Sequence, residues 1–330
     1  FQEHLEPGLV QCIIGGGEHG AAIVSAGIDG ICFTGSVNTG HKVALAAASA
    51  GITATLELGG KDAAVVLGDA DIGRAAQGIA WAAFAFAGQN CAAVERCYVH
   101  DSIYQPFLTA VIQHTKSLKL GTDIGPLVTK QQLDVVDGHV SEAIDKGASV
   151  HTGGRPTNEG YYYPPTVLSD VPSGASVLTE ETFGPVLPVI PFSNLEDLPD
   201  LVNGTAFGLT TSVWTSDLEM GEAIAENFNC GVVTINNHSF TGALPSAAWG
   251  GTKNTGHGIT NSRFALYEMT RPKTVVVDGS KQPEMWWFPH NSALLDVTRG
   301  LVELSRSGGN RLPALSQTLK GLLRRWKESS

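Results

Sequence analysis

A thiol and a carboxylate in glycine-rich surroundings are the side chains of this chain best suited to chemistry. Cys91 ends the run Gly88-Gln89-Asn90-Cys91, and Glu57 lies 34 residues earlier in Leu56-Glu57-Leu58-Gly59-Gly60-Lys61. A thiolate adds readily to a carbonyl carbon, and a nearby carboxylate activates the water that later releases the acyl group. The neighbouring glycines let backbone N–H groups approach a developing oxyanion. The pair therefore predicts acyl chemistry on a cysteine.

Each of these side chains also has an ordinary structural interpretation. A free cysteine is most often a small buried hydrophobic residue, and this is our interpretation of Cys12, Cys32, Cys97 and Cys230. Cys91 differs because it follows a long apolar helix and opens a polar loop, where partial exposure and backbone N–H donors lower the pKa of a thiol. For Glu57, the alternative to a general base is a surface carboxylate at the end of a strand.

The elements that must position this pair alternate between strand and helix. Hydrophobic periodicity and glycine turns predict strands at residues 9–14, 30–33, 53–58, 63–67, 95–99, 149–152, 185–192, 211–214 and 231–235, with helices at 18–26, 39–50, 72–87, 104–118, 131–146 and 219–226. Strands that alternate with helices imply an α/β fold with a doubly wound parallel sheet.

Composition excludes several classes of protein. The 330 residues leave room for about two domains, and a net charge of −11 argues against nucleic acid as a partner. Five widely spaced cysteines without a C-x-x-C pair favour free thiols in a reducing compartment, so we expect a cytoplasmic protein. The ten histidines show no spacing typical of metal ligands, and we expect no metal. No apolar run reaches the length of a membrane span.

Seven stretches of the chain, in order, resemble motifs of the aldehyde dehydrogenase superfamily over roughly residues 1–278. They are Phe33-Thr34-Gly35-Ser36, Leu56-Glu57-Leu58-Gly59-Gly60-Lys61, Gly88-Gln89-Asn90-Cys91, Glu180-Glu181-Thr182-Phe183-Gly184-Pro185-Val186, Phe207-Gly208-Leu209-Thr210, Gly231-Val232-Val233-Thr234-Ile235-Asn236 and Gly250-Gly251-Thr252-Lys253-Asn254-Thr255-Gly256. Each stretch alone is a weak signal, whereas the ordered set is specific.

The resemblance implies a dinucleotide-binding domain, a catalytic domain and a strand arm that joins subunits. On this basis we expect the second half of the dinucleotide-binding domain at residues 1–58, the catalytic domain at 59–252, a return segment and oligomerisation arm at 253–278, and a helical extension at 279–330. The family's first strands, its oxyanion asparagine and the lysine at the adenosine ribose have no counterpart here, so we expect an amino-terminal portion to be missing. A strand-like stretch at 274–278 resembles the arm, and we expect a homodimer or homotetramer.

The resemblance also implies roles for individual residues. Cys91 is the expected nucleophile and Glu57 the expected base, with NAD or NADP as the cofactor. The cofactor-binding residues implied are Gly35, Ser36, Leu58, Gly59, Glu181 and Phe183. Gly35 and Ser36 open a helix, whose free N–H groups suit a pyrophosphate, although Ser36 as a plain helix cap is the alternative. Residues 237–241, together with Phe84, are expected in the wall of a substrate funnel.

The expected reaction is oxidation of an aldehyde to a carboxylic acid through a cysteine thiohemiacetal and a thioester. Two alternatives stay open at this point. One is a truncated or split subunit that needs an amino-terminal partner, because missing strands would leave sheet edges exposed. The other is a hydrolase that uses Cys91 without a cofactor, which leaves Glu181, Phe183 and the Gly35-Ser36 turn unexplained.

The last fifty residues differ from the rest of the chain. An aromatic cluster, Trp286-Trp287-Phe288, precedes two helical patterns rich in leucine, the second of which also carries Lys320, Arg324, Arg325 and Lys327. A basic amphipathic helix of this kind lies on a membrane surface or covers an active-site mouth in some proteins. Packing against the protein's own body or its dimer mate is commoner, and that is our expectation.

Overall fold

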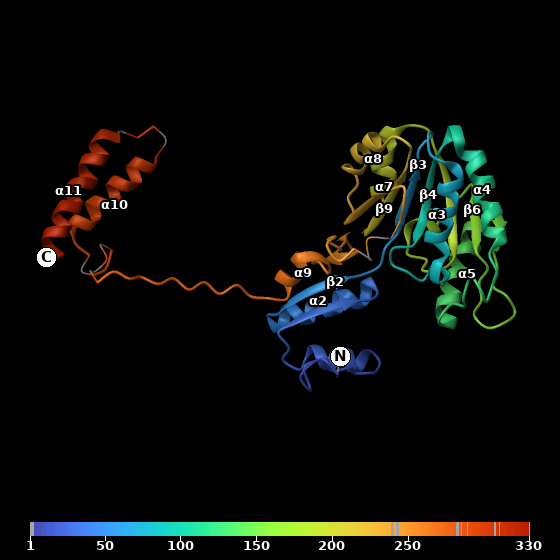
Figure 1. Cartoon of the computed structure of the whole chain (residues 1–330), viewed down its shortest axis with the longest axis horizontal. Coiled ribbons are helices and arrows are strands. Elements are labelled where there is room, and N and C mark those ends of the chain that lie inside the picture. The colour runs from blue at the N-terminus through green and yellow to red at the C-terminus, as the bar shows by residue number, and fades with distance from the viewer. Residues whose placement is uncertain are drawn as a thin grey trace. The chain divides into compact units, whose positions relative to one another are not determined.

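The computed structural model describes residues 3–238, 241, 244–281, 284, 286–288, 290–306, 308–309 and 311–329 (Figure 1). These residues form two compact units, residues 1–271 and residues 272–330. The first unit contains the residues expected to do chemistry, and its described part includes a three-stranded and a seven-stranded sheet. The predicted α/β class is confirmed.

The three-stranded sheet holds Glu57 at the end of a strand. Its strands are β1 (Gly30–Thr34), β2 (Thr53–Glu57) and β12 (Gly256–His257). β1 and β2 run parallel in the register Gly30↔Thr53 to Thr34↔Glu57, and β12 pairs antiparallel with β2. The carboxyl ends of the two parallel strands therefore lie at one edge of the sheet.

Helix α2 (Val37–Ala50) connects β1 to β2 and follows α1 (Gly17–Val24) in the chain. It begins at Ser36, whose Oγ accepts a hydrogen bond from the Thr39 backbone N–H at 3.3 Å. It ends at Gly51, where a φ of 69° suits a residue without a side chain. The cap fixes the first turn of the helix beside the carboxyl end of β1.

The seven-stranded sheet has the order β10-β9-β3-β4-β7-β6-β5. Its strands are β3 (Asp62–Val66), β4 (Val94–His100), β5 (Ser149–Thr152), β6 (Thr166–Ser169), β7 (Val186–Phe192), β9 (Thr210–Trp214) and β10 (Val232–Ile235). Every pairing is parallel except that of β5 with β6. A separate antiparallel pair joins β8 (Phe207–Gly208) to β11 (Thr252–Lys253).

Helices pack on both faces of the seven-stranded sheet (Figure 1). Alternate residues of β3 point to opposite sides, so that Ala64 and Val66 join one hydrophobic cluster while Ala63 and Val65 join another. Helices α3 (Ile72–Phe84), α4 (Tyr104–Ser117) and α5 (Lys130–Asp145) contribute to the first cluster, and α7 (Leu198–Asn203) and α8 (Leu218–Ala225) to the second. Two further short helices are α6 (Ser176–Thr179) and α9 (Ser262–Glu268). Burial on both faces explains the nearly continuous apolar strands.

Two predicted strands are wrong. Residues 9–14 and 274–278 form no strand in the structure, and Ile14 and Val276 are 93% and 85% exposed. β-branched residues favoured the prediction, but a strand also needs a neighbour for its backbone groups, and no sheet pairing reaches either stretch among the described residues. The helix predicted to reach residue 87 ends earlier, at Phe84, because the next residues leave the helical conformation.

The second unit contains a helical hairpin of α10 (Ser292–Ser305) and α11 (Arg311–Ser329), as the two leucine patterns predicted. Its inner face consists of small residues rather than leucines, with Ala293, Val297 and Gly300 on one helix and Ala314 and Thr318 on the other. Within the described part of the chain, no helix is both long and apolar enough to cross a membrane.

Candidate active site

Three loops that are far apart in the sequence meet where the chain passes from β2 to β3. The first is the turn from Glu57 to Lys61, the second is the Cys91 loop before β4, and the third is the loop from Glu181 to Phe183 before β7. The Gly60 backbone N–H donates a hydrogen bond to Glu181 Oε1 at 3.0 Å, and Gly60 also lies against the carbonyl oxygen of Cys91. The turn therefore contacts both other loops.

Glycine is required at this meeting point for lack of space. A Cβ atom on Gly60 would lie 2.1 Å from the Cys91 carbonyl oxygen, and one on Gly59 would lie 2.4 Å from Glu181 Oε2. The clash at Gly60 is with backbone and leaves no room for a side chain, whereas the clash at Gly59 is with the end of the flexible Glu181 side chain. The preceding residue, Leu58, packs against Gly40 of α2, and its N–H donates to the Thr255 carbonyl at 2.8 Å. Leu58 and Gly59, both predicted to bind cofactor, thus join α2 to the Glu181 loop.

The Cys91 loop is held by a left-handed backbone segment. Phe86, Ala87 and Gly88 have φ values of 55°, 58° and 69°, and the first two are unfavourable for residues with a side chain. Asn90 Oδ1 accepts a hydrogen bond from the Ala92 N–H at 3.0 Å. Strain of this kind persists where the surroundings fix the backbone, and it is common at functional sites.

The Cys91 thiol is partly buried, and its pKa is raised rather than lowered. Burial is the main cause and the carboxylates of Asp62, Glu57 and Glu181 add to it, so that the pKa reaches about 11. The expectation of a lowered pKa was therefore wrong for this structure, because a backbone N–H contact does not outweigh burial beside three carboxylates. The thiol holds its proton at neutral pH and needs a base before it can attack a carbonyl.

Glu57 is 5% exposed, so it is not the surface carboxylate of the alternative interpretation. Its Oε2 accepts a hydrogen bond from Trp249 Nε1 at 3.0 Å, and its Oε1 accepts one from Thr260 Oγ1 at 3.2 Å. Burial raises the pKa of Glu57, and these two hydrogen bonds oppose that rise. A carboxylate with a raised pKa that is held in one orientation suits a general base.

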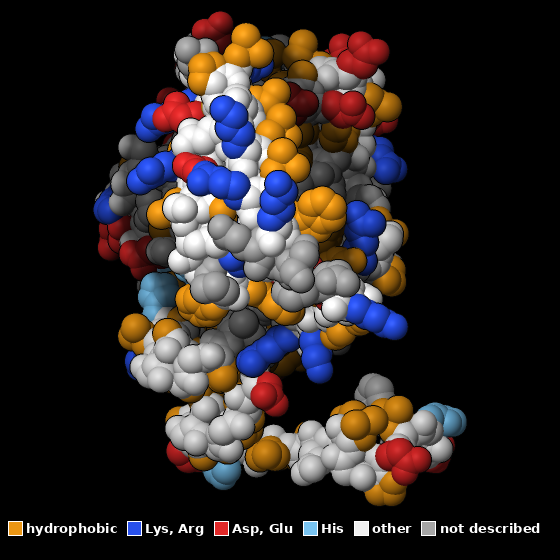
Figure 2. Space-filling model, turned by 90° about the vertical axis from the view of Figure 1, so that its left-hand side faces the viewer, with side chains coloured by type: hydrophobic (Ala, Val, Ile, Leu, Met, Phe, Trp, Pro, Cys, Tyr) orange, Lys and Arg blue, Asp and Glu red, His pale blue; other side chains and the backbone are white. Residues whose placement is uncertain are grey.

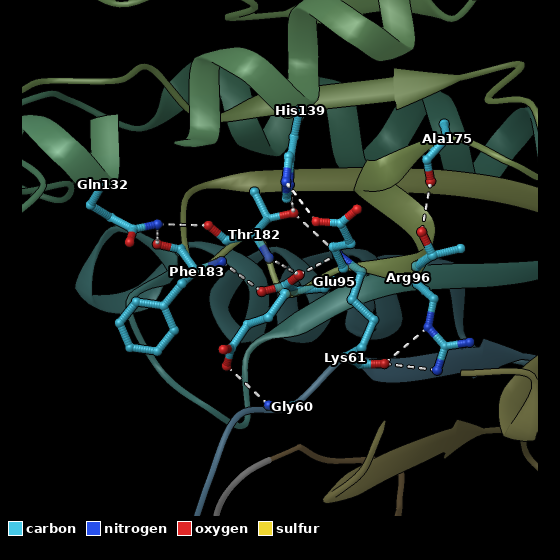
Figure 3. Close-up of polar contacts among 12 residues, drawn as sticks. Gly60, Lys61, Glu95, Arg96, Gln132, His139, Ala175, Thr182 and Phe183 are labelled. Carbon is cyan, nitrogen blue, oxygen red and sulfur yellow. Dashed lines mark hydrogen bonds and ion pairs between the residues drawn. The ribbon is translucent and has the colours of Figure 1, made fainter. Parts of the chain in front are cut away.

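A buried ion pair fixes the Glu181 loop (Figure 3). Lys61 Nζ pairs with Glu95, whose two carboxylate oxygens accept the backbone N–H groups of Thr182 at 2.8 Å and Phe183 at 2.9 Å. From α5, Gln132 Nε2 donates to the carbonyl oxygens of Thr182 at 2.8 Å and Phe183 at 3.2 Å. Phe183 is thereby held at a φ of 50°.

The residue after Lys61 is a second buried carboxylate. Asp62 is 2% exposed and accepts hydrogen bonds from the Thr210 N–H at 3.0 Å and Thr210 Oγ1 at 2.5 Å. Burial raises the pKa of Asp62 from 3.8 to about 8, against the effect of these bonds. Lys61 and Asp62 thus both make buried polar contacts that hold neighbouring segments together.

Gly35 and Ser36 lie at the exposed amino-terminal end of α2, with the Gly35 N–H donated to the Glu57 carbonyl at 3.1 Å. Ser36 is a helix cap, as its alternative interpretation held. The cap does not exclude an anion site, since the first N–H groups of any α-helix lack acceptors within the helix. The bond from Gly35 links this helix end to the strand that carries Glu57.

Two of the residues expected in the substrate funnel line different pockets. Phe84 lines an open pocket of about 830 Å³ together with Trp81, Phe86 and Gln89. Asn237 lines a different pocket, of about 500 Å³, beside Arg74. Ser239 and Phe240, which belong to the predicted 237–241 wall, lie outside the described residues.

Sequence reasoning missed two contacts, one with Glu57 and one with the residue after Cys91. Trp249 holds Glu57, and its position directly before the motif that begins at Gly250 was the available signal. His238 is fully buried, and its Nε2 lies 2.8 Å from the Ala92 carbonyl, next to Cys91. Burial lowers the pKa of His238 to about 4, so the imidazole is neutral. His238 belongs to the stretch 237–241 that was expected in the funnel wall, but its contact with the Cys91 loop was not predicted.

No group of three His, Cys, Asp or Glu side chains in the described part of the chain is arranged to hold a metal ion. The residues that the structure brings together instead offer a thiol, two carboxyl groups and backbone N–H donors. Such a set suits covalent and proton-transfer chemistry on a carbonyl compound.

Comparison with known proteins places the chain in a family. The model of the aldehyde dehydrogenase family matches residues 1–275. The chain is 35% identical to 4,4'-diapolycopene aldehyde oxidase of Methylomonas sp over 91% of its own length, and 36% identical to betaine aldehyde dehydrogenase of Bacillus subtilis over 80%. It spans 57% and 56% of the lengths of these two relatives.

A solved structure supports the same grouping. The aldehyde dehydrogenase of Mycobacterium tuberculosis complexed with NAD+ matches 80% of this chain with a TM-score of 0.76 and 34% identity, and the match covers 56% of that structure. The family model matches most of the chain, and the solved structure is similar to it in both sequence and fold. The chain belongs to the aldehyde dehydrogenase family.

Proposed function

We propose that this chain contributes the cysteine chemistry of an NAD(P)-dependent aldehyde dehydrogenase, with Cys91 as nucleophile and Glu57 as general base. The observation that supports this most is the Gly59-Gly60 turn, which follows Glu57 directly and contacts both the Cys91 loop and Glu181. The activity, the substrate and the cofactor are proposals, since the chain spans little more than half the length of its curated relatives.

Cys91 forms the covalent bond in this scheme. Its thiol releases its proton to water, and Sγ adds to the aldehyde carbon. The resulting oxyanion is stabilised by backbone N–H groups, that of Cys91 among them. The residues proposed below would hold a nicotinamide cofactor, which would supply the hydride acceptor for oxidation of this adduct to a thioester.

Glu57 completes the cycle by releasing the acyl group. Its carboxylate removes a proton from water, the water oxygen attacks the thioester carbon, and the C–S bond breaks to give a carboxylic acid and the free thiol. The hydrogen bonds from Trp249 and Thr260 keep the carboxylate in one orientation for this proton transfer.

The residues proposed to hold the cofactor fit such a group. The exposed amino-terminal end of α2, at Gly35 and Ser36, suits a pyrophosphate. Glu181 Oε1 accepts a hydrogen bond from the Gly60 N–H, and Oε2 faces Gly59. Because Gly59 has no side chain, a cofactor hydroxyl has room to approach Oε2. Burial raises the pKa of Glu181 to about 7. Phe183, fixed at a positive φ, supplies an aromatic wall.

The proposal is tested by measuring reduction of NAD+ and NADP+ with a panel of aldehydes, using both this chain and the longest polypeptide encoded by its reading frame. The names of the two relatives concern a polyene aldehyde and a cationic aldehyde, so the panel includes one of each kind. Cys91→Ser abolishes aldehyde-dependent reduction, whereas Cys230→Ser, at another partly buried cysteine, retains it. Full activity in Cys91→Ser overturns the assignment.

A homodimer or homotetramer, as the family resemblance implied, also stays a proposal. Sedimentation velocity over a range of concentrations measures the assembly state. A single monomeric species at all concentrations contradicts it.

A further inference from the structure

The hairpin of α10 and α11 packs with its small residues inside and its large apolar residues outside. A Cβ atom on Gly300 would lie 2.1 Å from Thr318 Oγ1, and one on Gly321 would lie 2.7 Å from Val297 Cγ2. The two helices therefore approach closely along a seam of small side chains. Water-soluble helical hairpins normally bury their leucines in this seam, whereas small residues at the seam are typical of helices in contact with lipid.

The outward apolar residues of α11 form one stripe. Leu312, Leu315, Leu319, Leu322, Leu323 and Trp326 are all exposed, and at 100° per residue they fall within an arc of about 100°. On α10, Leu294, Leu295, Leu301 and Val302 form a comparable stripe over about 120°. Both stripes contain no charged residue.

The two stripes lie on the same side of the hairpin. On each helix the stripe is turned by about 110–130° from the buried seam, in the direction of increasing residue number. Because the helices are antiparallel, equal turns place both stripes on one face. The opposite face carries the polar contacts between the helices, in which Asp296 pairs with Arg324 and accepts a hydrogen bond from Gln317 at 3.1 Å.

Hydroxyl groups on the apolar face offer little to a protein partner. Thr298 Oγ1 donates to the Leu294 carbonyl at 2.9 Å, and Ser305 Oγ donates to the Val302 carbonyl at 2.8 Å. Both hydrogen bonds stay within α10. Protein interfaces carry about one hydrogen bond per 100–200 Å², so a face whose hydroxyls are already satisfied suits an acyl-chain environment better.

Aromatic and basic residues point to the same occupant. Trp286, Trp287 and Phe288 are exposed and lie at the end of the hairpin where α11 finishes, as the bond from Arg325 to the Trp287 carbonyl at 2.6 Å shows. Tryptophan is enriched at membrane–water interfaces. Residues 272–330 carry nine Lys and Arg against five Asp and Glu, a net charge of +4, whereas residues 1–271 carry 12 against 27, a net charge of −15. Figure 2 shows Lys and Arg beside apolar side chains on this part of the chain.

We propose that the α10–α11 hairpin lies on the surface of a bilayer that contains anionic lipids, with its leucine face among the acyl chains. The hairpin belongs to the positively charged unit, residues 272–330, whereas residues 1–271 are strongly acidic. An anionic bilayer therefore attracts the chain through the hairpin rather than through the other unit. This inference does not depend on the proposed enzyme activity.

The test is co-sedimentation of the 330-residue chain with lipid vesicles, scored as a partition coefficient. In vesicles in which about a third of the lipid is phosphatidylserine, we expect binding that weakens with added salt and with replacement by phosphatidylcholine. Leu319→Gln with Leu323→Gln, both on exposed positions of the stripe, lowers the partition coefficient by about tenfold. Circular dichroism verifies that the helices remain folded.

The matched control is Leu45→Gln with Leu218→Gln, which changes two exposed leucines of α2 and α8 in the other unit. This control binds vesicles as the unaltered chain does. Equal losses in both double variants, or no binding by the unaltered chain, overturn the proposal. A dimer that forms without lipid and is abolished only by the hairpin variant also overturns it, and assigns the face to a second copy of the chain.

Discussion

Replacing one charge of the buried Lys61–Glu95 pair should unfold the chain far more readily than any surface change. Lys61 and Glu95 are 1% and 3% exposed, and Glu95 also accepts the backbone N–H groups of Thr182 and Phe183. In Glu95→Gln the amide oxygen keeps one of these bonds at most, and Lys61 is left without its countercharge. Breaking a buried pair in this way costs about 3–5 kcal/mol.

Urea unfolding measures this loss as a change in the free energy of unfolding. The matched control is Glu180→Gln, in the same loop, where the carboxylate side chain is 67% exposed and its ion pair with His139 is long at 3.8 Å. That variant should stay within about 0.5 kcal/mol of the unaltered chain. A loss below about 1 kcal/mol in Glu95→Gln would refute the view that this pair anchors the Glu181 loop.

Three further predictions follow from the pKa values and hydrogen bonds of the site. Asp62 has a pKa of about 8 in the folded chain and an ordinary pKa of 3.8, so between these values the folded chain retains a proton that the unfolded chain releases. The free energy of unfolding of the unaltered chain, relative to that of Asp62→Asn, therefore falls as pH rises from about 4 to 8. Urea unfolding across this range measures the difference, and a constant difference contradicts the prediction. Because the pKa of Cys91 is about 11, the reactive thiolate fraction rises about tenfold per pH unit up to about pH 9. The rate of Cys91 alkylation by iodoacetamide, measured by mass spectrometry, rises in the same proportion. A plateau in this rate near neutral pH argues against the burial described. Trp249→Phe removes a hydrogen bond that lowers the pKa of Glu57, so the pH profile of acyl-enzyme hydrolysis shifts its acidic limb upward; an unchanged limb contradicts the assignment of Glu57 as the base.

Much of the fold could be predicted because local patterns and packing agree. β5 was predicted at its observed bounds, and most helices and strands lie within a few residues of their predicted ends. The stretches at 9–14 and 274–278 failed because β propensity does not supply a pairing partner. β12 and β11, of two residues each, were missed because so short a strand exists only through its pairing with β2 or β8.

The site shows a similar division. Glu57, Cys91 and Glu181 could be selected from motifs, and the structure brings the loops that carry them together through Gly59 and Gly60. The raised pKa of Cys91 could not be predicted, since it depends on burial and on carboxylates contributed by two separate segments, residues 57–62 and the Glu181 loop. The roles of individual site residues and the domain bounds within residues 1–271 stay predictions.

Mass spectrometry of the Glu57→Gln variant, after incubation with an aldehyde and NAD+, tests the central claim most directly. The measurement uses the longest polypeptide encoded by the reading frame, with Glu57→Gln/Cys91→Ser as the control. The account predicts an acyl group that accumulates on Cys91 in the single variant, because attack proceeds while release by water is slow, and no acyl group in the double variant. An acyl group on another residue, or release from Cys91 as fast as in the unaltered enzyme, would contradict it.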